Sequence, residues 1–76
     1  LINKIMTQSE FNKYFKEEVL FHIARKYETD GIPDRPARRE AYNNATDDFC
    51  KNGFITEKQY NNWCISDSLE TTKYWL

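Results

Sequence analysis

Three arginines are the residues of this chain whose type and spacing most directly suggest chemistry. Arg35, Arg38 and Arg39 lie within one turn at the start of an expected helix, in the stretch RPARRE. Planar guanidinium groups so placed can bind phosphate or carboxylate in a bidentate manner. Cations at a helix N-terminus oppose the helix dipole, at a cost of roughly a few tenths of a kcal/mol. This cost favours a contact outside the helix, so we predict a partner-binding site at these arginines, with Tyr42 and Asn43 on the next turn.

Two other interpretations of the arginines stay open. They can form a solvated helix face with ion pairs between residues four apart. They can also contact nucleic acid, with the stretch EKQYNNWC as the recognition helix of a helix-turn-helix. Gln59, Asn61 and Asn62 are types that read adenine edges. That stretch holds one Lys, one Glu and no Arg, so its attraction for phosphate is weak.

The stretch DFCKNGFITEKQ, residues 48–59, has some features of an EF-hand calcium loop. Asp48 stands at the first position of the twelve and Gly53 at the sixth, as such loops require. Cys50 at the third position is a soft thiol where calcium needs oxygen, and Gln59 at the twelfth replaces the bidentate Glu. We therefore predict a turn between two helices here, and no metal site.

Catalytic chemistry has little support in the sequence. His22 falls within the first expected helix, beside a core-facing position, and no Ser-His-Asp set, Gly-rich phosphate loop or carboxylate pair is legible. Cys50 and Cys64 have no zinc-ligand spacing. In an antiparallel helix pair they lie about 9 Å apart along the axis, too far for a disulfide, so both are expected to be reduced packing residues. We predict a protein that is not an enzyme and takes no cofactor.

Size and charge limit the remaining possibilities. The chain has 76 residues, 11 basic against 12 acidic side chains and a net charge of −1, which disfavours a general polyanion binder. No apolar run approaches the ~20 residues of a membrane span, and no secretory segment stands at the N-terminus. We expect a cytoplasmic protein without membrane contact. Residues 1–6 are predicted to be a leader or a vector-derived start, ending at Met6.

Hydrophobic spacing predicts helices throughout. The first, about residues 8–28, begins with a capping box of Thr7 and Glu10. Its expected core stripe has a spacing of four: Phe11, Phe15, Val19, Ile23 and Tyr27. Three further residues widen this stripe: Tyr14, Leu20 and Ala24.

Two or three further helices are expected. The second runs from Pro36 to Gly53, with Ala41, Ala45 and Phe49 facing inward. The third runs from the capping box at Thr56 to about residue 65, and Ser66 or Asp67 caps a possible short fourth helix. The predicted fold is all-α, a small bundle of three helices with a possible fourth. Residues 7–65 form its single domain, and residues 66–76 form a tail or short helix.

Residues 30–63, DGIPDRPARREAYNNATDDFCKNGFITEKQYNNW, resemble a group of small uncharacterised proteins encoded by tailed phages and prophages of enterobacteria. The group shares a run of the form D-[KR]-P-A-R-R-E-A-[WY]-N-N, a C-K-[DN]-G-x-I turn and a Q-Y-x-x-W ending. The resemblance covers under half of the chain. It implies a bacterial cytosol and a phage accessory protein that acts by binding a host or phage protein.

Three functional hypotheses follow. The first is a small accessory protein that binds and modulates, for example inhibits, another protein through the arginines. The alternative is a nucleic-acid-binding helical module that uses Arg35, Arg38, Arg39 and the third helix. The third is a homodimer in which exposed aromatics, among them Tyr74 and Trp75, complete a core too small to stand alone.

Overall fold

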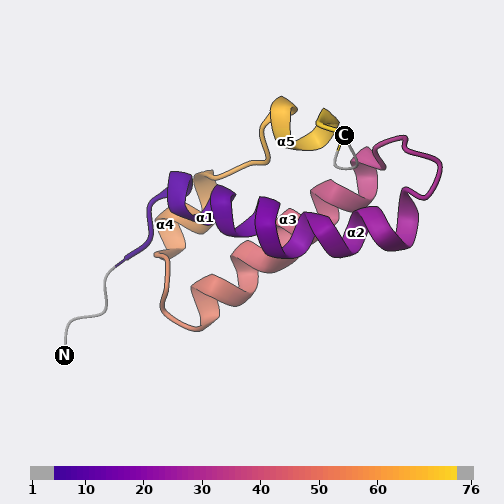
Figure 1. Ribbon diagram of the computed structural model, residues 1–76. Helices are drawn as coiled ribbons and strands as arrows, with labels where there is room; N and C mark the ends of the chain where they lie inside the picture. The colour runs from indigo at the N-terminus through magenta and orange to yellow at the C-terminus, as the bar shows by residue number, and fades with distance from the viewer. Residues whose placement is uncertain (1–4, 74–76) are drawn as a thin grey trace.

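The structure is a computed structural model that describes residues 5–73 of the chain, and it confirms the predicted all-α class (Figure 1). The first part of the chain forms one helical rod made of α1 (Gln8–Tyr14), a π-helical turn (Phe15–Val19) and α2 (Leu20–Tyr27). It is followed by α3 (Arg35–Lys51), α4 (Glu57–Asn62) and α5 (Asp67–Thr71). No strand forms within residues 5–73. The prediction about Tyr74 and Trp75 concerns residues outside the described part of the chain.

The rod begins at the predicted capping box. The Thr7 hydroxyl accepts a hydrogen bond from the Glu10 amide at 3.1 Å, and the Glu10 carboxylate accepts one from the Thr7 amide at 2.9 Å. These two bonds satisfy donors that a helix N-terminus otherwise leaves open. The predicted helix start is therefore confirmed.

A π-helical turn lies in the middle of the predicted core stripe. In an α-helix, residues four apart drift by about 40° per step, so a strict spacing of four winds away from the core. Here the Leu20 amide donates to the Phe15 carbonyl five residues earlier, and the extra residue in the turn offsets part of this drift. Phe11, Phe15 and Ile23 are buried, and so are Leu20 and Ala24, which widen the stripe as predicted. Tyr27 was also predicted to be in the core, but it is the last residue of α2 and is 53% exposed at the edge of a groove beside α3.

A short turn joins α3 to α4, as predicted for the EF-hand-like stretch. Gly53 has a φ of +81° in the left-handed region, which suits glycine. Its amide donates to the Cys50 carbonyl at 3.1 Å, and the Phe54 amide donates to the Phe49 carbonyl at 2.9 Å. This is a Schellman motif, and the Phe49 and Phe54 rings pack 5.5 Å apart across it.

The two C-terminal helices are short and both are capped. Thr56 and Gln59 form the second predicted capping box, but α4 ends at Asn62, before the expected boundary near residue 65. The Ser66 hydroxyl accepts a hydrogen bond from the Leu69 amide at 3.2 Å, so Ser66 caps α5. Leu69 is only 7% exposed and belongs to the main hydrophobic cluster. The short fourth element therefore packs with the rest of the bundle.

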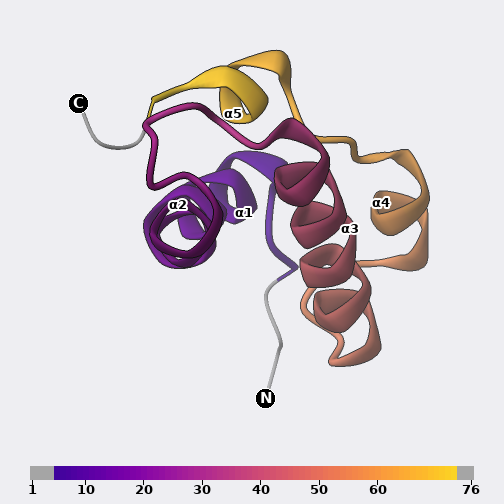
Figure 2. The same ribbon diagram turned by 90° about the vertical axis from the view of Figure 1, so that its right-hand side faces the viewer.

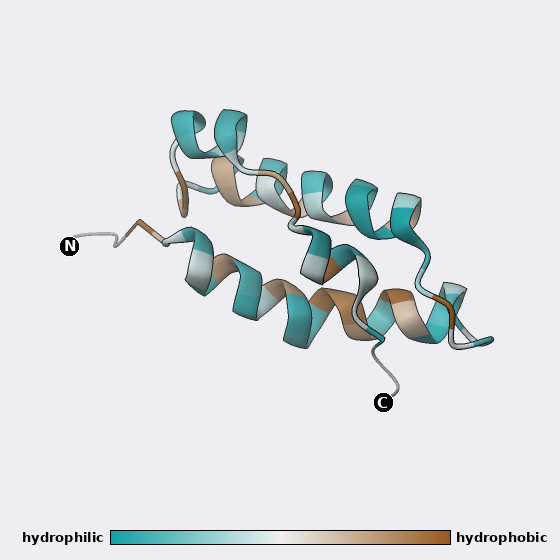
Figure 3. Ribbon diagram, turned by 90° about the horizontal axis from the view of Figure 1, so that it is seen from above, coloured by the Kyte–Doolittle hydropathy of each residue, from teal (hydrophilic) through white to brown (hydrophobic). Residues whose placement is uncertain are grey.

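The core lies between the rod and α3, which run side by side (Figures 1 and 2). In Figure 3 most of the apolar residues lie on the rod, whereas α3 is largely hydrophilic. Aromatic rings fill the interface: the Phe11 ring lies 5.1 Å from that of Tyr42, 5.2 Å from that of Phe49 and 5.8 Å from that of Trp63. A small chain with few aliphatic residues thus builds its core from large rings.

Two other parts of the chain differ from expectation or extend it. Met6, placed in a predicted leader, lies against the α3–α4 turn: its amide donates to the Phe54 carbonyl, and its carbonyl accepts from the Gln59 side chain. Cys50 and Cys64 are both free thiols, but Cys64 is exposed and is not a packing residue.

None of the described helices combines the length and the apolar character that crossing a membrane requires.

Candidate functional site

The three arginines in the first two turns of α3 lie in different environments. Asp34 caps this helix by accepting a hydrogen bond from the Ala37 amide at 3.1 Å, and a proline follows at the start, as the sequence predicted. Successive residues of an α-helix are turned by about 100°. Arg38 therefore lies on the inward stripe that also carries Tyr42, whereas Arg35 and Arg39 lie beside that stripe.

Arg38 is completely buried and joins three segments of the chain. Its Nε and Nη2 atoms donate to the two carboxylate oxygens of Glu28 at 2.9 and 2.7 Å. Its Nη1 atom donates to the carbonyls of Leu69 at 3.0 Å and Thr72 at 2.8 Å. The side chain thus holds the end of α2 and the end of α5 against the start of α3.

The Glu28 carboxylate is the buried counter-charge of Arg38. It is 2% exposed and also accepts a hydrogen bond from the Asp34 amide at 2.9 Å. Burial raises the pKa of Glu28, but the hydrogen bonds from Arg38 and Asp34, with the charge of Arg38, outweigh it and hold the pKa below the ordinary value of 4.5. Within residues 5–73 every buried side-chain nitrogen and oxygen has a hydrogen-bond partner. The buried ion pair between Arg38 and Glu28 therefore has its hydrogen-bonding groups satisfied, as a stable buried pair requires.

The partner-contact prediction needs correction for two of its five residues. Arg38 has no exposed surface because Glu28 and α5 enclose it. Tyr42 is also fully buried: its hydroxyl donates to the Asn12 side-chain oxygen at 2.7 Å and accepts from Gln8 at 3.3 Å. Burial raises the pKa of Tyr42 above its ordinary 10.0, against the opposing effect of the Gln8 hydrogen bond. Both residues support the fold and offer no surface to a partner.

The other three predicted residues are exposed, and we call them the arginine ridge: Arg35, Arg39 and Asn43. They follow one another at a spacing of four on α3. Glu70 of α5 holds both arginines. One of its carboxylate oxygens accepts from Nε and Nη2 of Arg35 at 2.9 and 2.6 Å, and the other accepts from Nε of Arg39 at 2.7 Å.

The two arginines of the ridge are much more exposed than the glutamate that holds them. The Glu70 side chain is 8% exposed, whereas those of Arg35 and Arg39 are 50% and 54% exposed. The hydrogen bond from Arg35 lowers the pKa of Glu70, partial burial opposes this, and Arg39 lowers it further. Arg39 gives only its Nε atom to Glu70, which leaves its two terminal nitrogens for a ligand. The ridge can therefore bind a carboxylate or a phosphate oxygen.

Sequence reasoning missed both glutamates. Glu70 belongs to the expected short fourth helix, and in the structure its carboxylate reaches the arginines of α3. The ion pairs of the arginines do not run between residues four apart either, since Glu28 precedes Arg38 by 10 residues and Glu70 follows Arg39 by 31. The sequence did contain one sign of these contacts. Three arginines lie on one short segment, and arginines so crowded require acidic partners from elsewhere in the chain.

Two of the three base-reading residues in the nucleic-acid interpretation are hydrogen-bonded within the fold. The side chain of Gln59 accepts from the Thr56 amide at 2.7 Å and donates to the Met6 carbonyl at 2.9 Å. Asn62 donates to the Lys58 carbonyl at 2.7 Å. Asn61 alone of the three is exposed without such a bond in the described part of the chain. Helix α4 therefore offers little for base recognition.

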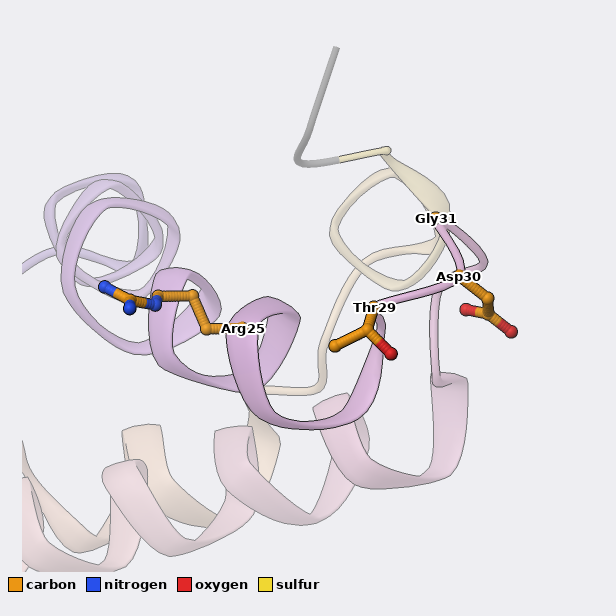
Figure 4. Close-up of a pocket in the computed structure, with 4 residues that line it drawn as sticks. All are labelled: Arg25, Thr29, Asp30 and Gly31. Atoms are coloured by element: carbon orange, nitrogen blue, oxygen red, sulfur yellow. The ribbon is translucent and has the colours of Figure 1, made fainter.

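A separate depression of about 510 Å³ lies at the end of α2, lined by Arg25, Thr29, Asp30 and Gly31. Figure 4 shows that the Arg25 side chain extends along α2, away from Thr29 and Asp30. Because the polar groups do not converge on a common point, this depression is not a built site. Among residues 5–73, no cluster of three or more His, Cys, Asp or Glu side chains could hold a metal ion.

Comparison with known proteins gives no relative from which a function could be transferred. No family model, no curated protein and no solved structure matches this chain.

Proposed function

We propose that the protein is a small, non-enzymatic accessory protein of the phage type that binds another protein and modulates it. The contact is the arginine ridge, Arg35, Arg39 and Asn43, which lies along the exposed edge of α3. The resemblance of residues 30–63 to phage and prophage proteins supports the class of protein, and the arrangement of the ridge supports the mode of binding.

The observation that carries this proposal is the fixed position of two half-exposed arginines. A free arginine side chain loses about 2 kcal/mol of rotamer entropy when it is immobilised. Glu70 already holds Arg35 and Arg39 through three hydrogen bonds. An acidic group on a partner therefore meets guanidinium donors that are already oriented, and less entropy is lost on binding.

An acidic protein surface fits the ridge better than nucleic acid does. Glu70 neutralises one of the two ridge charges, and the whole chain carries a net charge of −1. Nucleic-acid affinity depends on the number of phosphates that are neutralised. A single acidic side chain needs only one oriented guanidinium, and Asn43 adds a neutral donor and acceptor on the next turn.

The test is affinity capture from an enterobacterial lysate, read by mass spectrometry, with the wild type and two matched variants. Arg39→Gln removes the guanidinium of Arg39, with its two terminal nitrogens, but leaves both hydrogen bonds from Arg35 to Glu70, so α5 stays in place. Arg25→Gln removes an exposed arginine of α2, whose guanidinium lies 5.4 Å from the Phe21 ring centre, and is the control. We expect the first variant to capture about tenfold less of one dominant protein, the loss of a charge-assisted bond, and the second to capture as much as the wild type.

Nuclease treatment and salt separate the alternatives. Capture that survives nuclease and depends on Arg39 supports a protein partner. Capture that disappears with nuclease, and that falls steeply between about 50 and 200 mM salt, supports the nucleic-acid module instead. Equal capture by Arg39→Gln and the wild type rules out the ridge as the contact.

A further inference from the structure

One side of the helix pair formed by α2 and α3 is open. Helix α5 lies over one side of the pair and α4 lies along α3, whereas no described helix covers the opposite side (Figure 2). Ala41 is two residues from Arg39, and so lies about 200° around the helix from the arginine that binds α5. A groove of about 300 Å³ runs there between α2 and α3, lined by Ile23, Tyr27, Ala37, Glu40, Ala41 and Asn44.

The floor of this groove is apolar. Ile23 is 7% exposed and belongs to the core, and Ala37 and Ala41 are half-buried against it. Tyr27 forms the wall on α2 and is 53% exposed, so about half of this large side chain is left uncovered. Alanines at a spacing of four leave room for another helix to approach α3 at about 8 Å between axes.

The two rims of the groove carry opposite charges. On α2, the Lys26 ammonium lies 5.3 Å from the centre of the Tyr27 ring, which places it at the wall of the groove. On α3, Glu40 lines the same groove as Tyr27, so the two charges stand at a similar level along the helices. Both side chains are exposed, and in the described part of the chain neither Lys26 nor Glu40 makes a salt bridge.

We propose that the occupant of this groove is a second copy of the same chain. A two-fold axis parallel to the helices places α2 of one copy opposite α3 of the other, at the same level. Lys26 of each copy then faces Glu40 of the other, and both Tyr27 rings are covered. The result is an antiparallel four-helix arrangement with an isologous interface, a common solution for small helical chains.

The charge pattern favours a second copy over an unrelated helix. A ligand for this groove must present an acidic group to Lys26 and a basic group to Glu40, with an apolar face between them. The groove itself presents this same set of groups, so it is complementary to its own image. A chain of 76 residues also buries only about 60% of its unfolded surface, and dimerisation increases the buried fraction.

The first experiment is sedimentation velocity of the purified chain over a wide range of concentrations. We expect the wild type to change from monomer to dimer as the concentration rises. Ala41→Glu places a charge in the middle of the groove and should remain monomeric throughout. Asn61→Glu puts the same charge on an exposed position of α4, outside both the groove and the arginine ridge, and should dimerise like the wild type. Helical circular dichroism of both variants checks that they fold.

A charge-exchange experiment identifies the partner in the groove. Lys26→Glu and Glu40→Lys each create like-charge pairs across the interface and should weaken dimerisation about tenfold or more. The double variant restores opposite charges and should dimerise nearly as well as the wild type. A wild type that stays monomeric at every concentration, or a double variant no better than the single ones, would overturn the proposal. Neither outcome bears on capture through the arginine ridge.

Discussion

Arg38 and Arg39 are neighbours in the sequence, yet their environments are opposite. Arg38 has no exposed surface and uses all three of its nitrogen atoms inside the protein. Arg39 is 54% exposed and gives only its Nε atom to a carboxylate. A rotation of about 100° between consecutive helix residues is enough to separate a structural arginine from one that a partner can reach.

The two glutamates that hold these arginines are both buried, but they differ in the exposure of the arginines that they bind. Glu28 is enclosed with Arg38 and joins the ends of α2 and α5 to α3 through that arginine. Glu70 sits on α5 and meets two arginines that remain half in water. Residue type alone therefore does not identify a binding arginine, whereas exposure and unused donors do.

Replacing each arginine by alanine gives the largest contrast. Arg38→Ala leaves Glu28 buried without its counter-charge and removes a donor from the carbonyls of Leu69 and Thr72. We expect it to lower the free energy of unfolding by about 3–5 kcal/mol. This is comparable to the whole stability of a small domain, about 5 kcal/mol. Arg39→Ala should lower it by less than about 1 kcal/mol, because half-exposed pairs contribute little.

Urea unfolding followed by circular dichroism measures both variants. The control is Arg38→Met combined with Glu28→Gln, which removes both charges and should be more stable than Arg38→Ala. Similar losses for Arg38→Ala and Arg39→Ala would show that burial does not distinguish the two pairs.

Acid should destabilise the fold through the same two glutamates. Both carboxyls have a pKa below 4.5 in the folded protein, so their stabilising effect is complete above that pH. As the pH falls below about 4.5, the unfolded chain takes up protons first and the free energy of unfolding decreases until the lowered folded-state pKa values are passed. Urea unfolding at a series of pH values down to about 3 measures this slope.

The comparison predicts which glutamate dominates the acid response. A Glu28→Gln variant should show a flatter dependence on pH below 4.5 than the wild type, because its buried carboxylate is gone. If the slope is unchanged in Glu28→Gln, the acid sensitivity arises elsewhere in the chain.

Added salt should change the free energy of unfolding least of all these tests, and it further separates the exposed ion pairs from the buried one. High salt screens exposed pairs more than buried ones. Glu70→Gln removes the pairs with Arg35 and Arg39, so its stability deficit relative to wild type should shrink as sodium chloride is added. The deficit of Arg38→Ala should stay nearly constant in the same series of unfolding curves. A deficit of Glu70→Gln that is independent of salt would show that Glu70 acts by packing or by neutral hydrogen bonds.

Short-range features of the fold were predictable because their partners lie within a few residues of each other. The capping boxes at Thr7 and Thr56 and the turn at Gly53 all formed as their spacing indicates. Tyr27 was placed in the core because it continues the spacing of four, but it ends α2 and is 53% exposed. Whether another element covers the last residue of a helix is decided by packing and leaves no clear signal in residue types.

The candidate site was only partly predictable. The sequence placed five residues together on α3, and Arg35, Arg39 and Asn43 are exposed there. It gave no means of placing α5, which follows more than 25 residues after the arginines and supplies Glu70. Which arginines remain available depends on that docking.

The sequence by itself determined the helical class, the starts of the helices and the turn between α3 and α4, because hydrogen bonds between near neighbours decide these features. The tertiary structure alone decided that Arg38 lies inside and Arg39 outside. The physical reason is that burying a charge requires a matched counter-charge, and Glu28 reaches Arg38 only once α2 and α3 have packed against each other.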